Sequence, residues 1–302
     1  MTNRARYLNL VVLVGASIAL WWQSLAASLE LALSSDAHTH MLLILPLTIA
    51  LIYFEPKGSL PAFETNRAAG AILLSAALFF RGCAAWNPWH LSSGNCLSLN
   101  MFAIVIWWIG SVVLCFGMRV FRFLQLPLWF LFLIVPLPEA ALRWTVHFLQ
   151  YQSAAATSIL FRLAHVPVTR DGIILWIPGL EIDVEESCSS IRSSTMLVVI
   201  TFVLAQLFLR SWWRKILLVV VALPLSIAKN AVRIFTIAEL GTHVDRGFLN
   251  GRLHRQGGLV FLGLALIPML VMLWGLRRSE QGNPQGSPPG NKRSQDLTEI
   301  AT

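Results

Sequence analysis

The sequence has few charged residues. They make up 13% of the 302 residues, against 56% hydrophobic residues, and the mean hydropathy is +0.66. Because a soluble domain is about 25% charged, this composition excludes an ordinary soluble globular protein. The net charge of +8 would suit nucleic-acid binding, but in a membrane protein it more often reflects cytoplasmic loops rich in Lys and Arg. We therefore predict a polytopic membrane protein with no nucleic-acid partner.

The sequence also lacks the usual signatures of metal, redox and several protease sites. Its four cysteines show no CxxC spacing, and neither an HExxH nor a rhomboid GxSG motif occurs. These absences argue against zinc ribbons, dithiol redox sites, zinc proteases and rhomboid serine proteases. His38 and His40 are interpreted as an interfacial polar cluster rather than as metal ligands. We expect no metal and no cofactor.

Long apolar stretches predict an all-α bundle of transmembrane helices. A helix needs about 20 mostly apolar residues to cross a bilayer. The second and third candidate stretches are short or interrupted, and the first is expected to be retained because no clear signal-peptide cleavage site follows it. About eight spans are predicted, near residues 8–27, 39–54, 68–86, 97–118, 121–138, 189–209, 214–240 and 257–276.

The distribution of basic residues predicts the orientation. With eight spans, all the basic clusters fall on one side of the membrane, and cytoplasmic loops are the ones enriched in Lys and Arg. Both termini should then be cytoplasmic, and Cys188 and His254 should lie on the extracytoplasmic side of the plasma (inner) membrane. The clusters are Arg4/Arg6, Lys57/Arg67, Arg119/Arg122, Arg210/Arg214/Lys215 and Arg277/Arg278.

Two extracytoplasmic elements are expected between the predicted spans at 121–138 and 189–209. The segment 139–165 has a helical pattern but carries several charges, so we predict a surface-lying or partly re-entrant helix. The turn signals Asp171-Gly172 and Pro178-Gly179 then predict a short hairpin that leads into Cys188. At the other end, residues 279–302 are rich in Gly, Pro, Ser, Gln and Asn, which is typical of a disordered cytoplasmic tail. The transmembrane domain would thus occupy residues 1–278.

Cys188 is the strongest candidate for a chemical role. It stands just before a long apolar run, and a thiol at the start of a helix is favoured as the thiolate. Two carboxylates, Glu185 and Glu186, precede it. Because this anionic flank opposes a thiolate, activation would need a cation or a base nearby. The alternative is an ordinary helix cysteine, which is our interpretation of Cys115.

Arg233 and His254 are candidates to supply that cation and that base. A charge well inside a membrane span costs several kcal/mol and is tolerated when it faces the bundle interior and has a partner. Asn230 lies three residues before Arg233, on the same helical face. His254 immediately precedes the last span and is a candidate general base and acid. The alternatives are a snorkelling arginine and an ordinary interfacial histidine.

These motifs together resemble the exosortase/archaeosortase family. The resemblance covers most of residues 30–276 and is strongest from residue 130 onward. Further supporting segments are 132–138 and the approach 167–172. The motifs are Glu185-Glu186-Ser187-Cys188-Ser189-Ser190-Ile191-Arg192-Ser193, Asn230-Ala231-Val232-Arg233, and His254 ahead of a glycine-containing final helix.

The resemblance implies a membrane cysteine transpeptidase that recognises C-terminal sorting signals on exported proteins. Such a signal consists of a short motif (PEP-CTERM type in bacteria), a transmembrane helix and a basic tail, and the new C-terminus passes to a lipid or polysaccharide acceptor. The implied roles are nucleophile for Cys188, stabiliser for Arg233 and proton transfer for His254, with support from Asn230, Arg192 and Ser189. The family often has Gly where this chain has Ser190, which puts the local geometry and the choice of substrate in doubt.

Other functions and one covalent link also remain open from the sequence. A non-enzymatic transporter or a scaffold in polysaccharide export would use Arg233 for an anionic ligand and would not need Cys188. A glutamate-type prenyl-protein protease is disfavoured because the further His motifs are missing. Cys83 and Cys96 fall in one predicted exported loop, where an oxidising exterior permits a disulfide, with two free thiols as the alternative.

Overall fold

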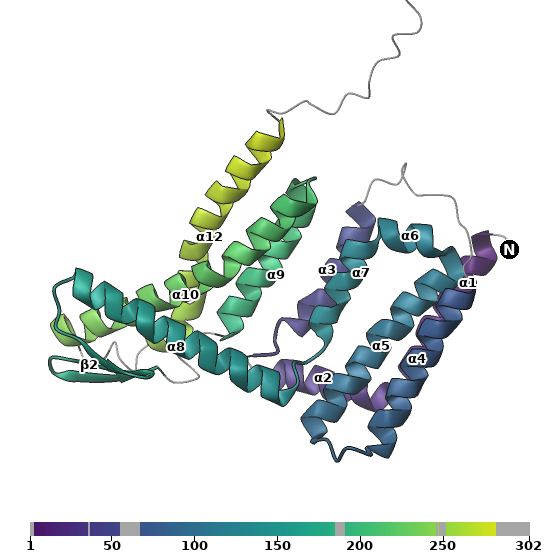
Figure 1. Cartoon of the computed structure of the whole chain (residues 1–302), viewed down its shortest axis with the longest axis horizontal. Helices are drawn as coiled ribbons and strands as arrows, with labels where there is room; N and C mark the ends of the chain where they lie inside the picture. The colour runs from purple at the N-terminus through teal and green to yellow at the C-terminus, as the bar shows by residue number, and fades with distance from the viewer. Residues whose placement is uncertain are drawn as a thin grey trace, which may run out of the picture.

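The computed structural model describes residues 3–35, 37–54, 67–184, 191–245, 247 and 252–281. These residues are mostly helical and include one small antiparallel sheet (Figure 1). The helices are α1 (Asn3–Leu20), α2 (Trp22–Ser34), α3 (Met41–Phe54), α4 (Arg67–Trp86), α5 (Ser93–Phe116), α6 (Met118–Phe123), α7 (Gln125–Phe130), η2 (Leu131–Ile134), α8 (Glu139–Leu163), α9 (Ile191–Phe208), α10 (Trp212–His243) and α12 (Arg252–Gln281). The strands are β1 (Thr169–Asp171), β2 (Ile174–Ile177) and β3 (Leu180–Asp183).

The described helices confirm a polytopic α-helical membrane protein. Five of them, α4, α5, α9, α10 and α12, are long and apolar enough to cross a bilayer. Two bent pairs, α1 with α2 at 76° and α7/η2 with α8 at 92°, raise the number to seven if each pair is one span, and α3 is a shorter apolar helix. The structure thus has five to seven candidate spans where eight were predicted. The predicted span 8–27 crosses the bend between α1 and α2, the span 121–138 is divided among α6, α7 and η2, and α3 is short.

The largest core surrounds α5 in the first half of the chain. Helix α5 packs on α4, and glycines on both helices bring their backbones close together. A Cβ atom on Gly70 would lie 2.6 Å from the Cα of Leu114, and one on Gly110 would lie 2.9 Å from the Cβ of Leu73. Small residues permit this close approach between membrane helices. A separate core cluster joins α9, α10 and α12 in the second half.

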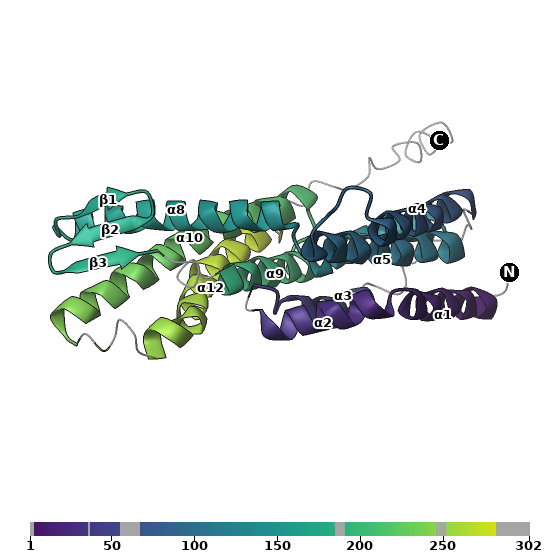
Figure 2. The same cartoon turned by 90° about the horizontal axis from the view of Figure 1, so that it is seen from below.

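Helix α8 lies across the bundle rather than along it (Figures 1 and 2). Pro136 and Pro138 interrupt the helical pattern before it, because proline disfavours helix in the residue it follows. The corner is then held by Glu139, whose carboxylate accepts from the Ser92 hydroxyl at 2.6 Å and whose backbone N–H donates to Asn95 at 2.9 Å. This 92° bend agrees with the predicted surface-lying or re-entrant helix.

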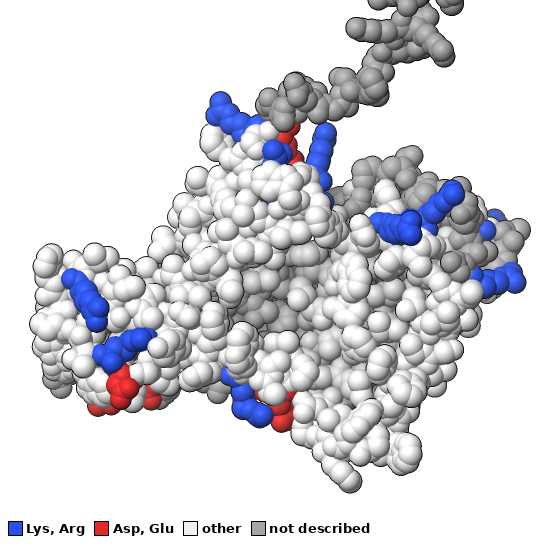
Figure 3. All heavy atoms as spheres, viewed as in Figure 1, with Lys and Arg blue, Asp and Glu red and all other residues white. Residues whose placement is uncertain are grey.

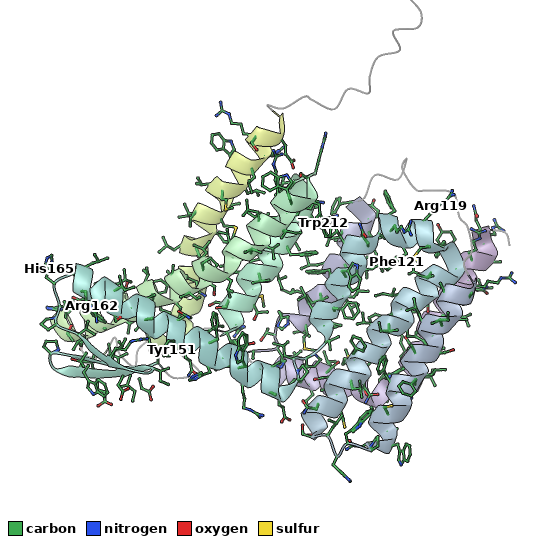
Figure 4. The ribbon with its side chains drawn as sticks, in the orientation of Figure 1. Arg119, Phe121, Tyr151, Arg162, His165 and Trp212 are labelled. Carbon is green, nitrogen blue, oxygen red and sulfur yellow. The ribbon has the colours of Figure 1, made fainter. Side chains whose placement is uncertain are left out.

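The predicted hairpin is present as a three-stranded sheet in the order β1-β2-β3. Both connections are antiparallel, with Asp171 opposite Ile174 and Ile177 opposite Leu180. Gly172 and Gly179 occupy the turns with φ angles of 59° and 81°, a backbone region that glycine enters without strain. Figure 4 labels Tyr151 on α8, and Arg170 on β1 stacks over its ring at 4.7 Å. The sheet is thereby attached to the side of α8.

The helix ends that carry the predicted basic clusters lie at one end of the molecule. These are the starts of α1 and α4, the segment α6, the α9–α10 turn and the end of α12 (Figure 1). In Figure 3 blue side chains gather along this edge, above a wide band of uncharged surface. Arg119 marks the same end in Figure 4. We call it the basic end.

The last helix runs past the boundary predicted for the disordered tail. Helix α12 continues to Gln281, three residues beyond residue 278. Its Glu280 carboxylate accepts from the backbone N–H groups of Arg210 and Ser211, at 3.0 and 2.8 Å, and lies 3.3 Å from the Arg214 guanidinium. These contacts tie the end of α12 to the α9–α10 turn. The remainder of the predicted tail lies outside the described residues.

Candidate functional site

Helix α10 carries a stripe of polar residues in the middle of an apolar sequence. Ser226, Lys229, Asn230 and Arg233 follow the spacing i, i+3, i+4 and i+7, which places them on one face of the helix. All four are buried, with exposed fractions of 1%, 5%, 1% and 5%. The stripe therefore faces the protein interior, and the snorkelling interpretation of Arg233 is wrong.

The stripe meets polar residues of α9 and α8. The Ser226 hydroxyl donates to the Ser194 hydroxyl at 2.5 Å, and the Lys229 ammonium donates to the Ser193 hydroxyl. The Asn230 amide donates to the Ser153 hydroxyl at 3.0 Å. Each of these serines is buried. Three helices thus converge on a polar cluster, consisting of Ser153, Ser193, Ser194, Ser226, Lys229, Asn230 and Arg233.

The polar cluster is positively charged. Lys229 and Arg233 lie one turn apart and are buried, and no carboxylate is buried among the residues that the structure describes. Taking a charge out of water is costly unless the charge is hydrogen-bonded or paired. Like charges four residues apart on a helix also repel each other. The cluster thus places two basic side chains, Lys229 and Arg233, on one face of α10 in the protein interior.

The cluster also holds an unused acceptor. The Asn230 side-chain oxygen is buried and has no hydrogen-bond partner among the described residues. Leaving a buried acceptor unsatisfied costs about 1–3 kcal/mol. The amide nitrogen of the same side chain donates to Ser153, so the side-chain oxygen can accept one further hydrogen bond.

Cys188 lies in residues 185–190, outside the described residues, but the chain on both sides of that segment is placed. Val184 is fully buried and packs with Ala154 of α8 and Ile234 of α10. Its carbonyl accepts from the Gln150 side chain at 2.9 Å. On the far side, Ser193 in the first turn of α9 binds Lys229. Both flanks of the segment are therefore attached to the stretch of α10 that contains Lys229 and Arg233.

The backbone of His254 lies in the first turn of α12, and its side chain is outside the described residues. Gly258 is one turn further along the same helix. A Cβ atom on Gly258 would lie 3.9 Å from the Cβ and Oγ atoms of Ser193. Gly258 therefore faces the start of α9. Position 254, four residues earlier, lies on the same face of α12.

The cluster lies toward the end of the bundle opposite the basic end. Helix α9 runs from Ser193, which binds Lys229, to the turn that Glu280 holds. Helix α12 runs in the same direction, from position 254 to Glu280 (Figure 1). Among the expected site residues, Arg233 and Asn230 are thus buried together in the cluster. Positions 188 and 254 are close along the chain to residues that contact or face this region.

Arg192, which the sequence also suggested for the site, is not among the residues of the cluster. Arg192 is exposed in the first turn of α9, and Ser189 lies outside the described residues. Five members of the cluster were not among the site residues selected from the sequence: Ser153, Ser193, Ser194, Ser226 and Lys229. Lys229 had a detectable signal, because it completes the i, i+3, i+4, i+7 spacing on α10. Ser153 had none, since serines are common and its partner Asn230 lies 77 positions away.

The predicted disulfide is not formed in this structure. Cys83 and Cys96 are both free thiols. They lie inside α4 and α5 rather than in the loop between these helices. The Cys96 sulfur lies 3.8 Å from the carbonyl oxygen of Leu91. Helix α4 ends at Trp86, where the predicted span ends, whereas α5 begins at Ser93, four residues before the predicted span, so Cys96 lies in its first turn.

His38 and His40 form a half-buried polar turn between α2 and α3. The His38 ring is 3.0 Å from the Ser35 hydroxyl. Burial lowers the pKa of both histidines, and the neighbouring His38 lowers the pKa of His40 further. No group of three or more His, Cys, Asp or Glu side chains suited to a metal ion occurs in the described part of the chain.

Together the fold and the site define a class: a multi-pass membrane protein with a buried, positively charged polar cluster between its helices. The family model described as Transmembrane exosortase (Exosortase_EpsH) matches residues 21–271. The chain therefore belongs to the transmembrane exosortase family, whose members are generally cysteine transpeptidases. Neither the search of curated proteins nor the search of solved structures finds a match.

Proposed function

We propose that this protein cleaves C-terminal sorting signals of exported proteins by cysteine catalysis and transfers the new C-terminus to a surface acceptor. The observation behind the proposal is that Lys229 and Arg233 are both buried on α10. Both flanks of the Cys188 segment are attached to this stretch of the helix. An anionic flank beside Cys188 would oppose a thiolate, and nearby cations reverse that effect.

The reaction would proceed in two steps. Cys188 gives its thiol proton to His254, and the thiolate attacks the substrate carbonyl carbon to form a tetrahedral oxyanion. The C–N bond breaks, His254 returns the proton to the leaving amine, and a thioester remains on Cys188. The acceptor nucleophile then gives its proton to His254 and attacks the thioester, the C–S bond breaks, and the departing sulfur takes that proton back, which restores the Cys188 thiol.

We assign to Arg233 the role of stabilising the oxyanion and to Lys229 the role of holding α9 in position. A donor aimed at a developing negative charge is worth most in a site that excludes water, and Arg233 is only 5% exposed. Lys229 binds Ser193, five residues after Cys188. Lys229 thereby acts as a positioning residue for the segment that carries the nucleophile and adds a second positive charge.

The substrates would be exported proteins that end in a short motif, a transmembrane helix and a basic tail, and the acceptor a lipid or polysaccharide. The location of the cluster supports this assignment. It lies opposite the basic end, and the end enriched in Lys and Arg faces the cytoplasm in most membrane proteins. The site would therefore open to the outer side of the plasma (inner) membrane, where the motif of an exported protein emerges.

The decisive experiment compares Cys188→Ala with Cys96→Ala in cells that produce a tagged substrate protein. We expect Cys188→Ala to abolish the size shift of the substrate on a gel, because no other group can form the thioester. Cys96→Ala, a half-buried cysteine of the first half, should process normally at equal enzyme abundance. Normal processing by Cys188→Ala would rule out cysteine catalysis and favour the transporter or scaffold function.

A further inference from the structure

A cavity of about 730 Å³ lies at the basic end, where α3, α9, α10 and α12 meet. Its lining combines an apolar wall with cations from three chain segments. Arginine and lysine beside apolar side chains match the two parts of an anionic lipid, a charged headgroup and a hydrocarbon chain. The residues that matter here are Leu51, Phe54, Phe208, Arg210, Lys215 and Arg277.

Among the described residues that line the cavity, three are basic and one, Glu280, is acidic. Glu280 also lines the cavity, but its carboxylate accepts from the backbone of Arg210 and Ser211 and pairs with Arg214 at 3.3 Å. Arg277 is held over the Phe208 ring at 5.5 Å. Because Arg214 pairs with Glu280, this carboxylate does not cancel the charge that Arg210 and Arg277 bring to the cavity.

A second, apolar cavity of about 370 Å³ adjoins the first on the other side of α9. The two cavities share Gln206 and Lys215, whose side chains are joined by a hydrogen bond of 2.8 Å. From Lys215 the second cavity follows α10 to Val219 and Val220. Val219 lies roughly one helical turn further from the basic end than Lys215, and Val220 is exposed on the outer surface of α10. Trp212, at the start of α10, also lines it (Figure 4).

We propose that the two cavities bind one anionic phospholipid. Arg210, Lys215 and Arg277 hold its phosphate, and an acyl chain occupies the apolar cavity beside Val219. A guanidinium donates two parallel hydrogen bonds to a phosphate, and basic pockets between transmembrane helices suit anionic headgroups. A basic peptide tail would be repelled by the same cations. This site is independent of the proposed peptidase activity, because it lies at the opposite end of the bundle.

The test uses the full chain, purified and freed of lipid in detergent. Native mass spectrometry measures the binding of phosphatidylglycerol and of phosphatidylcholine with identical acyl chains. Each cation near an anionic lipid contributes about a factor of five. The double variant Arg210→Gln/Arg277→Gln should therefore lower the affinity for phosphatidylglycerol roughly 25-fold. Arg278→Gln should leave it within about twofold, since Arg278 lies at the same end but stacks on Trp274 outside the cavity.

A second comparison separates a lipid from a soluble anion. Val220→Trp fills the apolar cavity and should weaken the binding of phosphatidylglycerol. Soluble glycerol phosphate should bind the unaltered protein far more weakly than the lipid does. If the double variant does not accumulate in the membrane, Arg277→Gln alone should give about a fivefold loss. Equal binding of the two lipids, equal losses in the double variant and Arg278→Gln, or glycerol phosphate binding as tightly as the lipid would each overturn the proposal.

Discussion

Arg233 is a buried cation that sequence and structure identify for the same reason. A charged side chain within an apolar span is expensive, and this one is 5% exposed rather than directed to the membrane surface. The next residue in the chain, Ile234, packs with Val184, which directly precedes the segment with Cys188. The residue scale therefore provides the sharpest tests of the proposed chemistry.

Replacing Arg233 should reduce processing without removing the protein from the membrane. We expect Arg233→Ala to slow processing of a tagged substrate roughly 10²–10³-fold, because one donor to the oxyanion is lost. Arg233→Lys should recover only part of the rate, since a point charge does not replace a planar guanidinium. The measurement is the time course of the gel shift, normalised to enzyme abundance.

The matched control for Arg233 is Arg143→Ala, which removes an arginine whose side chain is 74% exposed on α8. It should process at the rate of the unaltered enzyme. A rate for Arg233→Ala that equals this control would contradict the assignment of Arg233 to the oxyanion.

Lys229 should affect how readily Cys188 reacts. The change Lys229→Met removes one of two buried cations and the bond to Ser193. The pH at which Cys188 reaches half of its maximal alkylation rate should then rise by about one unit, because a nearby cation favours the thiolate. Lys229→Arg should restore most of the effect, and the measurement is the pH profile of labelling by a small thiol reagent.

The control here is Lys215→Met, which lies on the same helix at the basic end. Its pH profile should match that of the unaltered protein. An unchanged profile in Lys229→Met would mean that Lys229 acts only in packing, and the assignment would fail.

At the scale of elements, the close approach of α4 and α5 depends on glycine. A Cβ atom on Gly70 would lie 2.6 Å from the backbone of Leu114, so Gly70→Ala forces the helices apart. We expect a loss of about 1–3 kcal/mol, the usual cost of overpacking. Thermal unfolding of the purified protein in detergent measures it.

Gly82→Ala tests whether the effect comes from packing or from removing a helix glycine. Gly82 lies on the same helix, and a Cβ atom there has no heavy atom within 4 Å. This variant should be unchanged or more stable, by up to about 1 kcal/mol, because alanine is the better helix former. Equal unfolding temperatures for the two variants would refute the close-packing explanation.

For the whole molecule, the two ends of the bundle differ in charge and should face different compartments. The basic end includes Arg278, and the polar cluster lies toward the opposite end. In a protein whose other cysteines are replaced, Cys188 should react with a membrane-impermeant thiol reagent in intact spheroplasts. A cysteine introduced by Arg278→Cys, with Cys188 also replaced, should react only after the membrane is permeabilised.

Mass spectrometry or a gel-shift label measures both reactions. Labelling of the two positions in the opposite pattern would show that the basic end faces outward, and the orientation inferred from charge would be wrong. The family assignment rests on the match over residues 21–271 and would not change.

The sequence by itself determined the class of protein, the approximate positions of the helices and the central residue of the site. Apolar runs about 20 residues long leave few alternatives to membrane helices, because backbone polar groups in lipid must be satisfied within the helix. Arg233 and Asn230 were visible because polar residues inside such a run are rare. The turn signals around Gly172 and Gly179 likewise predicted the hairpin, since they depend on local backbone geometry alone.

Only the tertiary structure decided which residues meet across helices. The contacts of Asn230 with Ser153 and of Lys229 with Ser193 join positions 77 and 36 residues apart, and no local periodicity encodes such a pairing. The 92° bend before α8 depends on the contacts of Glu139 with the α4–α5 loop. The earlier start of α5 places Cys96 inside that helix rather than in the loop, and both Cys83 and Cys96 are free thiols. Side-chain contacts of this kind depend on how complete helices pack against each other, which a pattern along one helix does not specify.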